Sequence, residues 1–325
     1  MREPDPVRPV ADAHLTRRTA LAGGIVGLGA AVAALTGCSD ATSKPRRATM
    51  PAQSRTGSSP ARSPRSSSAP SPSTVTPSGE TSTSSPLGRK VSGSFVSAKR
   101  GGLRTGWTIG YPPGTHSGAL PVLIALHGKG GSHAAPFTEL HLDRFVADAV
   151  HGGMPPFAVA GVDGGHGRYW HPRHQDDPAG MVIEEFLPLL AEHGLDTRRV
   201  GLFGWSMGGY GALYLASVLG RARTACAGAE SPAIWRTYSE GVPGAFDDPA
   251  DFAAHSIFAR SPELAGIPIR IDSAISEPYA APIADLRSKL RPPPAGRPVP
   301  GGHDVTLWLR QAPAQVAFAG AHLHR

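Results

Sequence analysis

The sequence predicts an α/β protein in which helices cover both faces of a mostly parallel, doubly wound sheet. From residue 91 onward, short apolar runs alternate with longer stretches of helical periodicity, which is the order of strands joined by crossover helices. The run at 122–126, Val-Leu-Ile-Ala-Leu, is apolar throughout, as expected of a strand that is buried on both sides. In such sheets the reacting groups gather at the carboxyl ends of the strands.

The predicted elements follow one another in chain order. A strand at 107–111 stops at the two prolines of 112–113, because proline cannot continue a strand's hydrogen-bonded ladder. After the strand at 122–126, further strands are expected at 157–162, 200–203, 224–229 and 267–271, with helices at 137–150, 181–193, 207–219 and 281–290.

Residues 1–37 read as an export signal. Arg17 and Arg18 precede an uncharged run at 20–36, which is shorter than the roughly 20 residues of a membrane span. The run ends in Leu-Thr-Gly-Cys at 35–38, similar to a bacterial lipobox, which implies cleavage before Cys38 and lipid attachment to its sulfur. The segment 16–21 also resembles a twin-arginine signal. A general secretory signal and a plain N-terminal anchor helix stay open. The protein is expected outside the cytoplasm, in the cell envelope or secreted.

Residues 38–90 are predicted to be a disordered linker. Ser, Thr, Pro, Ala and Arg dominate this stretch, and too few large apolar side chains are present to offset the entropy of ordering. The catalytic domain is then expected at 91–325. The net charge of +7 arises before it, since residues 1–90 hold 12 Lys/Arg against 5 Asp/Glu and the rest holds 20 of each. The predicted domain therefore lacks the basic excess of a nucleic-acid-binding protein.

The segment 204–208, Gly-Trp-Ser-Met-Gly, lies between a predicted strand and a predicted helix. It fits the pattern G-x-S-x-G, in which a serine occupies a sharp strand-to-helix turn. Side chains two residues before and after the serine would clash there, and Gly204 and Gly208 have none. The turn exposes the hydroxyl at a helix N-terminus, where the dipole favours developing negative charge. We therefore predict that Ser206 is a nucleophile.

A serine hydroxyl becomes nucleophilic when a histidine accepts its proton and a carboxylate orients that histidine. On this type of turn the chain order is Ser, acid, His. His303 lies in a Gly-Gly-His-Asp loop after the last predicted strand and is the candidate base, whereas His322 and His324 fall in the final four residues. Two carboxylates are candidates for the acid. Glu277 is favoured over Asp272, because it lies on the loop beyond the strand and not in the strand itself.

Acyl transfer passes through a tetrahedral oxyanion, which needs two hydrogen-bond donors. One is expected to be the backbone N–H of Met207, directly after the serine. The other is expected from Lys129, in the His-Gly-Lys-Gly-Gly loop at 127–131 that follows a predicted strand. This loop has no G-K-[ST], so a nucleotide-binding interpretation is excluded.

Together these motifs resemble the putative-esterase group of α/β-hydrolases, which includes esterase D, feruloyl and acetyl-xylan esterases and the antigen 85 mycolyltransferases. The resemblance spans about residues 95–320 and implies an α/β-hydrolase fold and serine esterase activity. Two features depart from the group: Ala274 and Glu277 stand where relatives often have Gly and Asp, and 291–300, where a strand is usual, is mostly Pro, Gly and Arg. The motifs that carry the resemblance are 126–128 (Leu-His-Gly), 162–165 (Val-Asp-Gly-Gly), 204–209 and 301–304.

Residues 232–265 interrupt the sheet pattern, and in this fold such an insertion commonly forms a lid over the active site. Its aromatic side chains would either line the substrate pocket or pack the insertion onto the core. They are Trp235, Tyr238, Phe246, Phe252 and Phe258.

The expected activity is hydrolysis of a small-molecule, glycan or lipid ester through an acyl-enzyme on Ser206. Two alternatives stay open: an acyltransferase in which a sugar or lipid hydroxyl replaces water, and a non-catalytic binding lipoprotein on the cell surface. No organic cofactor or metal is implied, since side chains and backbone supply all the chemistry. Four neighbouring residues have metal-ligand side chains but no task in this reaction: His166, His171, His174 and Asp176.

Overall fold

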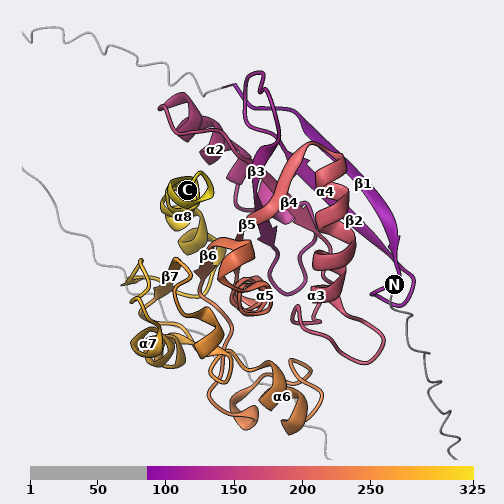
Figure 1. The fold of residues 1–325 in the computed structure, drawn as a ribbon. Helices are drawn as coiled ribbons and strands as arrows, with labels where there is room; N and C mark the ends of the chain where they lie inside the picture. Colours follow the sequence, from indigo (N-terminus) through magenta and orange to yellow (C-terminus); the bar gives the residue numbers. More distant parts are fainter. Residues whose placement is uncertain (1–85) are drawn as a thin grey trace, which may run out of the picture. The chain divides into compact units, whose positions relative to one another are not determined.

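An eight-stranded sheet runs through the computed structural model, which describes residues 86–325 (Figure 1). The predicted export signal (1–37), Cys38 and the predicted linker up to residue 85 lie outside the described residues. Within 86–325, no helix is long and apolar enough to cross a membrane.

The strand order in the sheet is β1-β2-β4-β3-β5-β6-β7-β8. The pairs β1–β2 and β2–β4 are antiparallel and all other pairs are parallel, which confirms the predicted mostly parallel sheet. The strands are β1 (Lys90–Ser97), β2 (Leu103–Gly110), β3 (Leu120–Leu126), β4 (Ala158–Val162), β5 (Leu195–Trp205), β6 (Thr224–Glu230), β7 (Ile269–Ala274) and β8 (Pro298–Val299).

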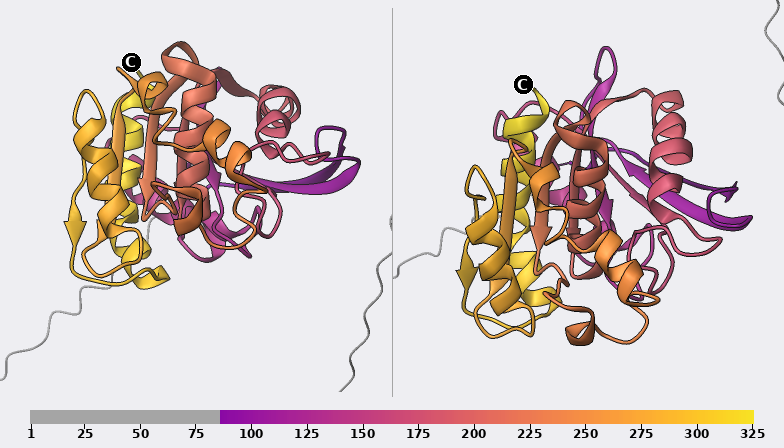
Figure 2. Two further views of the ribbon diagram at one scale, coloured as in Figure 1. Left: turned by 90° about the horizontal axis from the view of Figure 1, so that it is seen from below. Right: turned by 60° about the horizontal axis from the view of Figure 1, so that its bottom comes forward.

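Helices cover both faces of this sheet (Figure 2). On one face lie α5, α7 and a continuous helix made of α3, the π-helical turn η1 and α4; on the other lie α2 and α8, packed against each other. The helices are α1 (Ala135–Thr138), α2 (Leu142–His151), α3 (Pro178–Met181), η1 (Val182–Phe186), α4 (Leu187–Glu192), α5 (Met207–Arg223), α6 (Pro249–His255), α7 (Ala280–Lys289) and α8 (Val305–Leu323), with short 3₁₀ turns η2 (Tyr238–Glu240) and η3 (Ser261–Leu264).

The apolar run in β3 divides between two hydrophobic cores. Val122, Ile124 and Leu126 pack on the side of α5, and Leu123 and Ala125 pack on the side of α2 and α8. Successive side chains of a strand point to opposite faces, so a strand buried on both sides has no polar face. This is the physical reason for the unbroken run.

The first strand, β1, is absent from the sequence-based prediction. It pairs with β2 at the edge of the sheet, and most of its residues are exposed. An edge strand with one exposed face needs few apolar side chains, so Lys-Val-Ser-Gly-Ser-Phe-Val-Ser carries little signal. β2 is also longer than predicted, since it starts at Leu103 rather than residue 107.

Two further boundaries differ from prediction. The helix expected at 137–150 is divided into α1 and α2 by His141, whose φ of 48° is left-handed and interrupts helical hydrogen bonding. A short strand, β8, does precede His303, although 291–300 is rich in Pro and Gly. It has two residues and pairs with the end of β7, and a proline is tolerated there because β8 is an edge strand.

The segment 232–265 contains η2, α6 and η3, at the bottom of the view in Figure 1. Its aromatic residues mainly pack against the core. Trp235 and Phe246 are buried and contact the ring of Tyr169, Phe252 packs against Phe246, and Tyr238 is exposed.

The strand β6 ends in a buried carboxyl group. Glu230 is fully buried, and neither of its carboxyl oxygens has a hydrogen-bond partner among residues 86–325. Burial, with a smaller contribution from the negative charge of Asp272, raises the pKa of Glu230 well above its usual range. We therefore expect a neutral carboxylic acid at this position at pH 7.

Replacing Glu230 by Gln should flatten the pH dependence of stability. In the wild type the unfolded chain ionises Glu230 above about pH 4.3 while the folded chain keeps it protonated. Stability is therefore lost as pH rises towards the folded pKa, by up to about 1.4 kcal/mol per pH unit. Urea unfolding at pH 5 and pH 8 measures this loss, which should be smaller in Glu230→Gln. Glu192→Gln, the same change at an exposed position, is the control and should behave as the wild type does.

Candidate active site

Ser206 occupies the turn between β5 and α5 with a strained backbone. Its φ and ψ are 53° and −120°, a combination that is costly for a residue with a side chain. Neighbouring backbone groups hold it there: its N–H donates to the carbonyl of Glu230 at 2.9 Å, and its own carbonyl accepts from Tyr210 and Ala233. The predicted nucleophile thus sits at the carboxyl end of a central strand.

Three backbone segments meet around Ser206, and the turn is possible because the two glycines beside the serine have no side chains. A Cβ on Gly204 would collide with the backbone of Gly208, and a Cβ on Gly208 would collide with the carbonyl of Leu126 at the end of β3. No side-chain rotation can relieve a clash with a backbone atom. The turn therefore requires glycine at both positions.

A chain of hydrogen bonds joins three of the predicted residues. The hydroxyl of Ser206 lies 2.9 Å from Nε2 of His303, and Nδ1 of His303 lies 2.8 Å from a carboxylate oxygen of Glu277. The other oxygen of Glu277 accepts from the backbone N–H of Ala274 at 3.1 Å. The Glu277 side chain is fully buried, whereas that of His303 is 21% exposed, so the imidazole is open to a substrate.

His303 is positioned by the start of α8. Asp304 caps this helix, its carboxylate accepting from the N–H of Leu307 at 3.0 Å, so the helix begins directly after the histidine. The imidazole stands edge-to-face against the rings of Tyr279 and Trp308, with ring centroids 5.0 and 5.2 Å away.

Asp272, the other candidate acid, serves a different purpose. Its carboxylate pairs with the guanidinium of Arg270 through two hydrogen bonds and accepts from the side-chain amide of Gln315 at 3.0 Å. It also accepts from the backbone N–H of Arg297, and no hydrogen bond joins it to His303. Asp272 thus ties β7 to α8 and to the segment before β8.

The cavity at Ser206 has a volume of 390 Å³. Lys129, a predicted oxyanion donor, lines it, and Met207, the other, follows Ser206 as the first residue of α5. Neither backbone N–H donates a hydrogen bond within the described residues. The lining consists of Gly128, Lys129, Gly130, Gly131, Glu139, Trp205, Ser206, His303 and Trp308.

His127 holds the glycine loop in place. Its Nδ1 lies 2.8 Å from the carbonyl of Gly128, and its Nε2 accepts from the backbone N–H of Gly164 at 3.0 Å. Burial lowers the pKa of His127, which favours the neutral ring that can both donate and accept. The conformation of the loop before Lys129 thus depends on a buried side chain from the same motif.

The insertion's aromatic residues do not line this cavity. Trp235 and Phe246 instead surround Tyr169, so the alternative of packing onto the core is the one observed. Trp235 reaches the site indirectly, because its ring contacts that of Tyr279, which in turn contacts His303.

The residues with metal-ligand side chains at 166–176 do not come together. Asp176 pairs with the buried guanidinium of Arg100 at 2.9 Å, and the exposed His174 faces Asp247 at 3.2 Å. His171 is buried and lies beside Asp251 and His255, to which the sequence analysis gave no role. The only signal for that pair was its spacing of four residues, which places both side chains on one face of a helix.

Comparisons with solved structures find the same fold. The FphF fluorophosphonate-binding serine hydrolase of Staphylococcus aureus matches with a TM-score of 0.61 at 16% identity, covering 72% of this chain and 99% of its own. The ferulic acid esterase AmCE1/Fae1A of Anaeromyces mucronatus matches with a TM-score of 0.57 at 18% identity, covering 73% and 92%. MPT51 of Mycobacterium tuberculosis matches with a TM-score of 0.54 at 16% identity, covering 68% and 94%.

Because the sequence identities are low, the similarity to these proteins shows the fold alone, which is that of the α/β-hydrolases. None of the curated protein sequences matches the chain. The family described as "Putative esterase" matches residues 102–272, which include β2 to β6, most of β7 and the turn at Ser206. The chain therefore belongs to the putative esterase family.

Proposed function

We propose that the protein is a serine carboxylic-ester hydrolase that works through an acyl-enzyme on Ser206. The observation that supports this most is the hydrogen-bond chain from Ser206 through His303 to Glu277, with the serine on a strained turn beside an open cavity. Membership of the putative esterase family agrees with it.

In the first half of the reaction, the oxygen of Ser206 attacks the ester carbonyl carbon while its proton passes to Nε2 of His303. The carbonyl oxygen becomes an oxyanion, which the N–H groups of Met207 and Lys129 stabilise. The tetrahedral intermediate then collapses, the ester C–O bond breaks, and the departing alkoxide takes the proton from His303. An alcohol leaves, and the acyl group stays on Ser206.

The second half repeats these steps with water. His303 accepts a proton from a water molecule that attacks the acyl-enzyme, and the proton returns to the oxygen of Ser206 as the carboxylic acid leaves. Glu277 holds the Nδ1–H of His303, which keeps the Nε2 lone pair directed at the serine. Its carboxylate also stabilises the imidazolium that forms in each half.

The proposed substrates are esters whose acyl group fits a cavity of 390 Å³, a size typical of small-molecule sites. Trp205 and Trp308 line it. The ring of Trp205 is buried, and the half-buried indole of Trp308 offers flat apolar surface to an aromatic or short aliphatic acyl group. Ferulate esters are candidates, since the structural neighbours include ferulic acid esterases.

We also propose that the enzyme acts outside the cytoplasm, held at a membrane by a lipid on Cys38. The leader at 1–37 and its lipobox-like end at 35–38 support this. The 52 residues from 39 to 90 would then give the catalytic domain reach from the membrane surface.

Replacing Ser206 by Ala should abolish ester hydrolysis without unfolding the protein. With p-nitrophenyl acetate and butyrate as substrates, kcat/KM is expected to fall by at least about three orders of magnitude, because no other group can form the acyl-enzyme. Equal rates in the wild type and the variant would exclude Ser206 as the nucleophile. Product analysis with a sugar added as acceptor distinguishes hydrolysis from acyl transfer.

The two carboxylates should respond oppositely to replacement by their amides. Glu277→Gln is expected to lower kcat/KM about 10³- to 10⁴-fold with little change in stability, because the amide no longer fixes the tautomer or the charge of His303. Asp272→Asn is expected to cost about 3 kcal/mol of stability, because Arg270 loses its buried partner, with kcat/KM of the folded enzyme within about tenfold of the wild type. Steady-state kinetics and urea unfolding of both variants measure this, and the reverse order of effects would identify Asp272 as the acid.

A further inference from the structure

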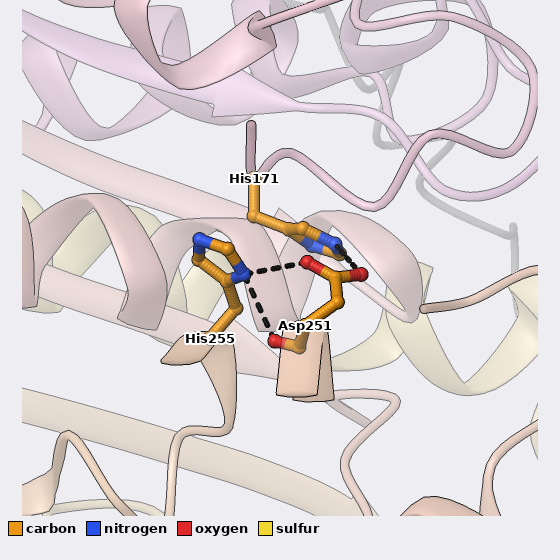
Figure 3. A group of neighbouring side chains, drawn as sticks. All are labelled: His171, Asp251 and His255. Carbon is orange, nitrogen blue, oxygen red and sulfur yellow. Dashed lines mark hydrogen bonds and ion pairs between the residues drawn. The ribbon is translucent and has the colours of Figure 1, made fainter. Parts of the chain in front are cut away.

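One group of side chains outside the proposed active site has the composition of a metal site. His171 lies in the loop after β4, and Asp251 and His255 lie four residues apart on α6 (Figure 3). One ligand atom from each side chain lies within 4.8 Å of the others. Two segments about 80 residues apart in the sequence thus bring two imidazoles and a carboxylate together.

The ring of His171 presents an unused lone pair to this group. Its Nδ1 lies 2.7 Å from the carbonyl oxygen of Tyr169, which can only accept, so the ring proton is on Nδ1. Nε2 therefore carries the lone pair. It is buried, has no hydrogen-bond partner among the described residues, and lies 3.4 Å from an oxygen of Asp251. A lone pair facing a carboxylate is repulsive unless a cation or a proton lies between them.

The hydrogen bond from Nδ1 of His171 to a backbone carbonyl is the second contact that metal-binding histidines typically make, since it fixes the ring and its tautomer.

Hydrogen bonds hold the side chains of Asp251 and His255 next to His171. Nδ1 of His255 lies 2.8 Å from Asp251 Oδ1 and 2.9 Å from the backbone carbonyl oxygen of Asp251, so its ring proton is on Nδ1. Asp251 Oδ2 accepts from the backbone N–H of Asp247 at 2.8 Å. Asp248 caps α6 by accepting from the N–H of Asp251, which fixes the first turn of the helix. A metal ion bound at Nδ1 of His255 would displace the proton that this nitrogen now directs at the two oxygens of Asp251.

We propose that His171, Asp251 and His255 bind one divalent transition-metal ion of the zinc class through two imidazole nitrogens and one carboxylate oxygen. This donor set suits Zn²⁺, whereas Ca²⁺ and Mg²⁺ prefer oxygen ligands throughout. Ligands at 2.0–2.1 Å from a tetrahedral ion lie roughly 3.4 Å apart, so the group closes on the ion by small side-chain rotations. Three protein ligands leave a fourth position for water.

The charges around the group allow a divalent cation. Asp251 contributes one negative charge, and the guanidinium of Arg173 in the same loop is paired with Asp247. Arg173 also donates to the carbonyl of Gly244, so the loop after β4 already contacts the insertion at a second point. The ion would add a link from this loop to α6 itself.

The position of the site suggests a structural role. The hydroxyl of Tyr210 lies 3.1 Å from Nδ1 of His171 and donates to the carbonyl of His255, and Tyr210 is in the first turn of α5, after Ser206. A bound ion therefore fastens the insertion to the helix that carries the proposed nucleophile, without touching Ser206, His303 or Glu277.

The test is zinc binding by the full chain after treatment with a chelator and desalting. We expect one Zn²⁺ per chain by elemental analysis, and a tetrahedral visible spectrum when Co²⁺ is used as the probe. His255→Ala should lose both signals. His174→Ala is the matched control, because it removes an exposed histidine of the same loop and should keep both. Equal zinc content in the two variants, or none in the wild type, would overturn the proposal.

Thermal unfolding provides a second, independent readout. A ligand that binds only the folded state raises the unfolding temperature, so zinc at about a hundredfold excess over its Kd should raise it by about 5 °C or more in the wild type and in His174→Ala. No rise is expected in His255→Ala, and an equal rise in all three proteins would contradict the assignment. If His255→Ala does not fold, as judged by its circular dichroism and hydrolysis of p-nitrophenyl butyrate, Asp251→Asn takes its place with the same expected loss.

Discussion

The close approach of three backbone segments around Ser206 is the constraint on which the rest of the site depends. The ends of β3 and β5 and the first turn of α5 meet so tightly that Gly204 and Gly208 have no room for a Cβ. This contact forces Ser206 into its left-handed conformation, and the backbone of β6 stabilises it by accepting the serine N–H. Strain of this kind persists only where the surrounding structure determines it several times over. Here the close contacts with β3 and α5 and the hydrogen bond to β6 all hold the backbone of Ser206 in this conformation.

The second constraint is the placement of three acidic residues at the ends of β6 and β7. Asp272 is paired with Arg270, and burial raises the pKa of Glu230 well above its usual range. Glu277 is left as the carboxylate that faces His303, with one oxygen on the imidazole and the other on a backbone N–H. Three carboxyl groups thus take three different roles over a short distance, because each has different surroundings.

The insertion at 232–265 acts mainly as a packing element. Its buried aromatic rings meet Tyr169 and Tyr210 and so brace the helix that follows Ser206, while the cavity beside the serine opens between the glycine loop and α8. A sequence shows how many aromatic residues such a segment contains, but it does not show which residues each ring packs against. For the same reason the sequence did not reveal that His171 lies beside Asp251 and His255, because this contact depends on how α6 packs against the loop after β4.

The sequence by itself determined the class of fold and the order of its elements. A strand buried on both sides needs a continuous apolar run, and the turn at the serine needs flanking glycines, so both features can be recognised within a few consecutive residues. The sequence also named Ser206, Glu277 and His303 as candidates, because the serine directly follows a predicted strand and the chain order Ser, acid, His places the other two after the last predicted strand. Only the tertiary structure decided which carboxylate forms the hydrogen bond with His303. Glu277 and Asp272 are only five residues apart in the sequence, and the path of the loop after β7 determines which of the two reaches the imidazole. The tertiary structure alone revealed the edge strand β1, whose exposed residues carry almost no apolar signal, and the raised pKa of Glu230, which follows from burial among groups distant in the chain.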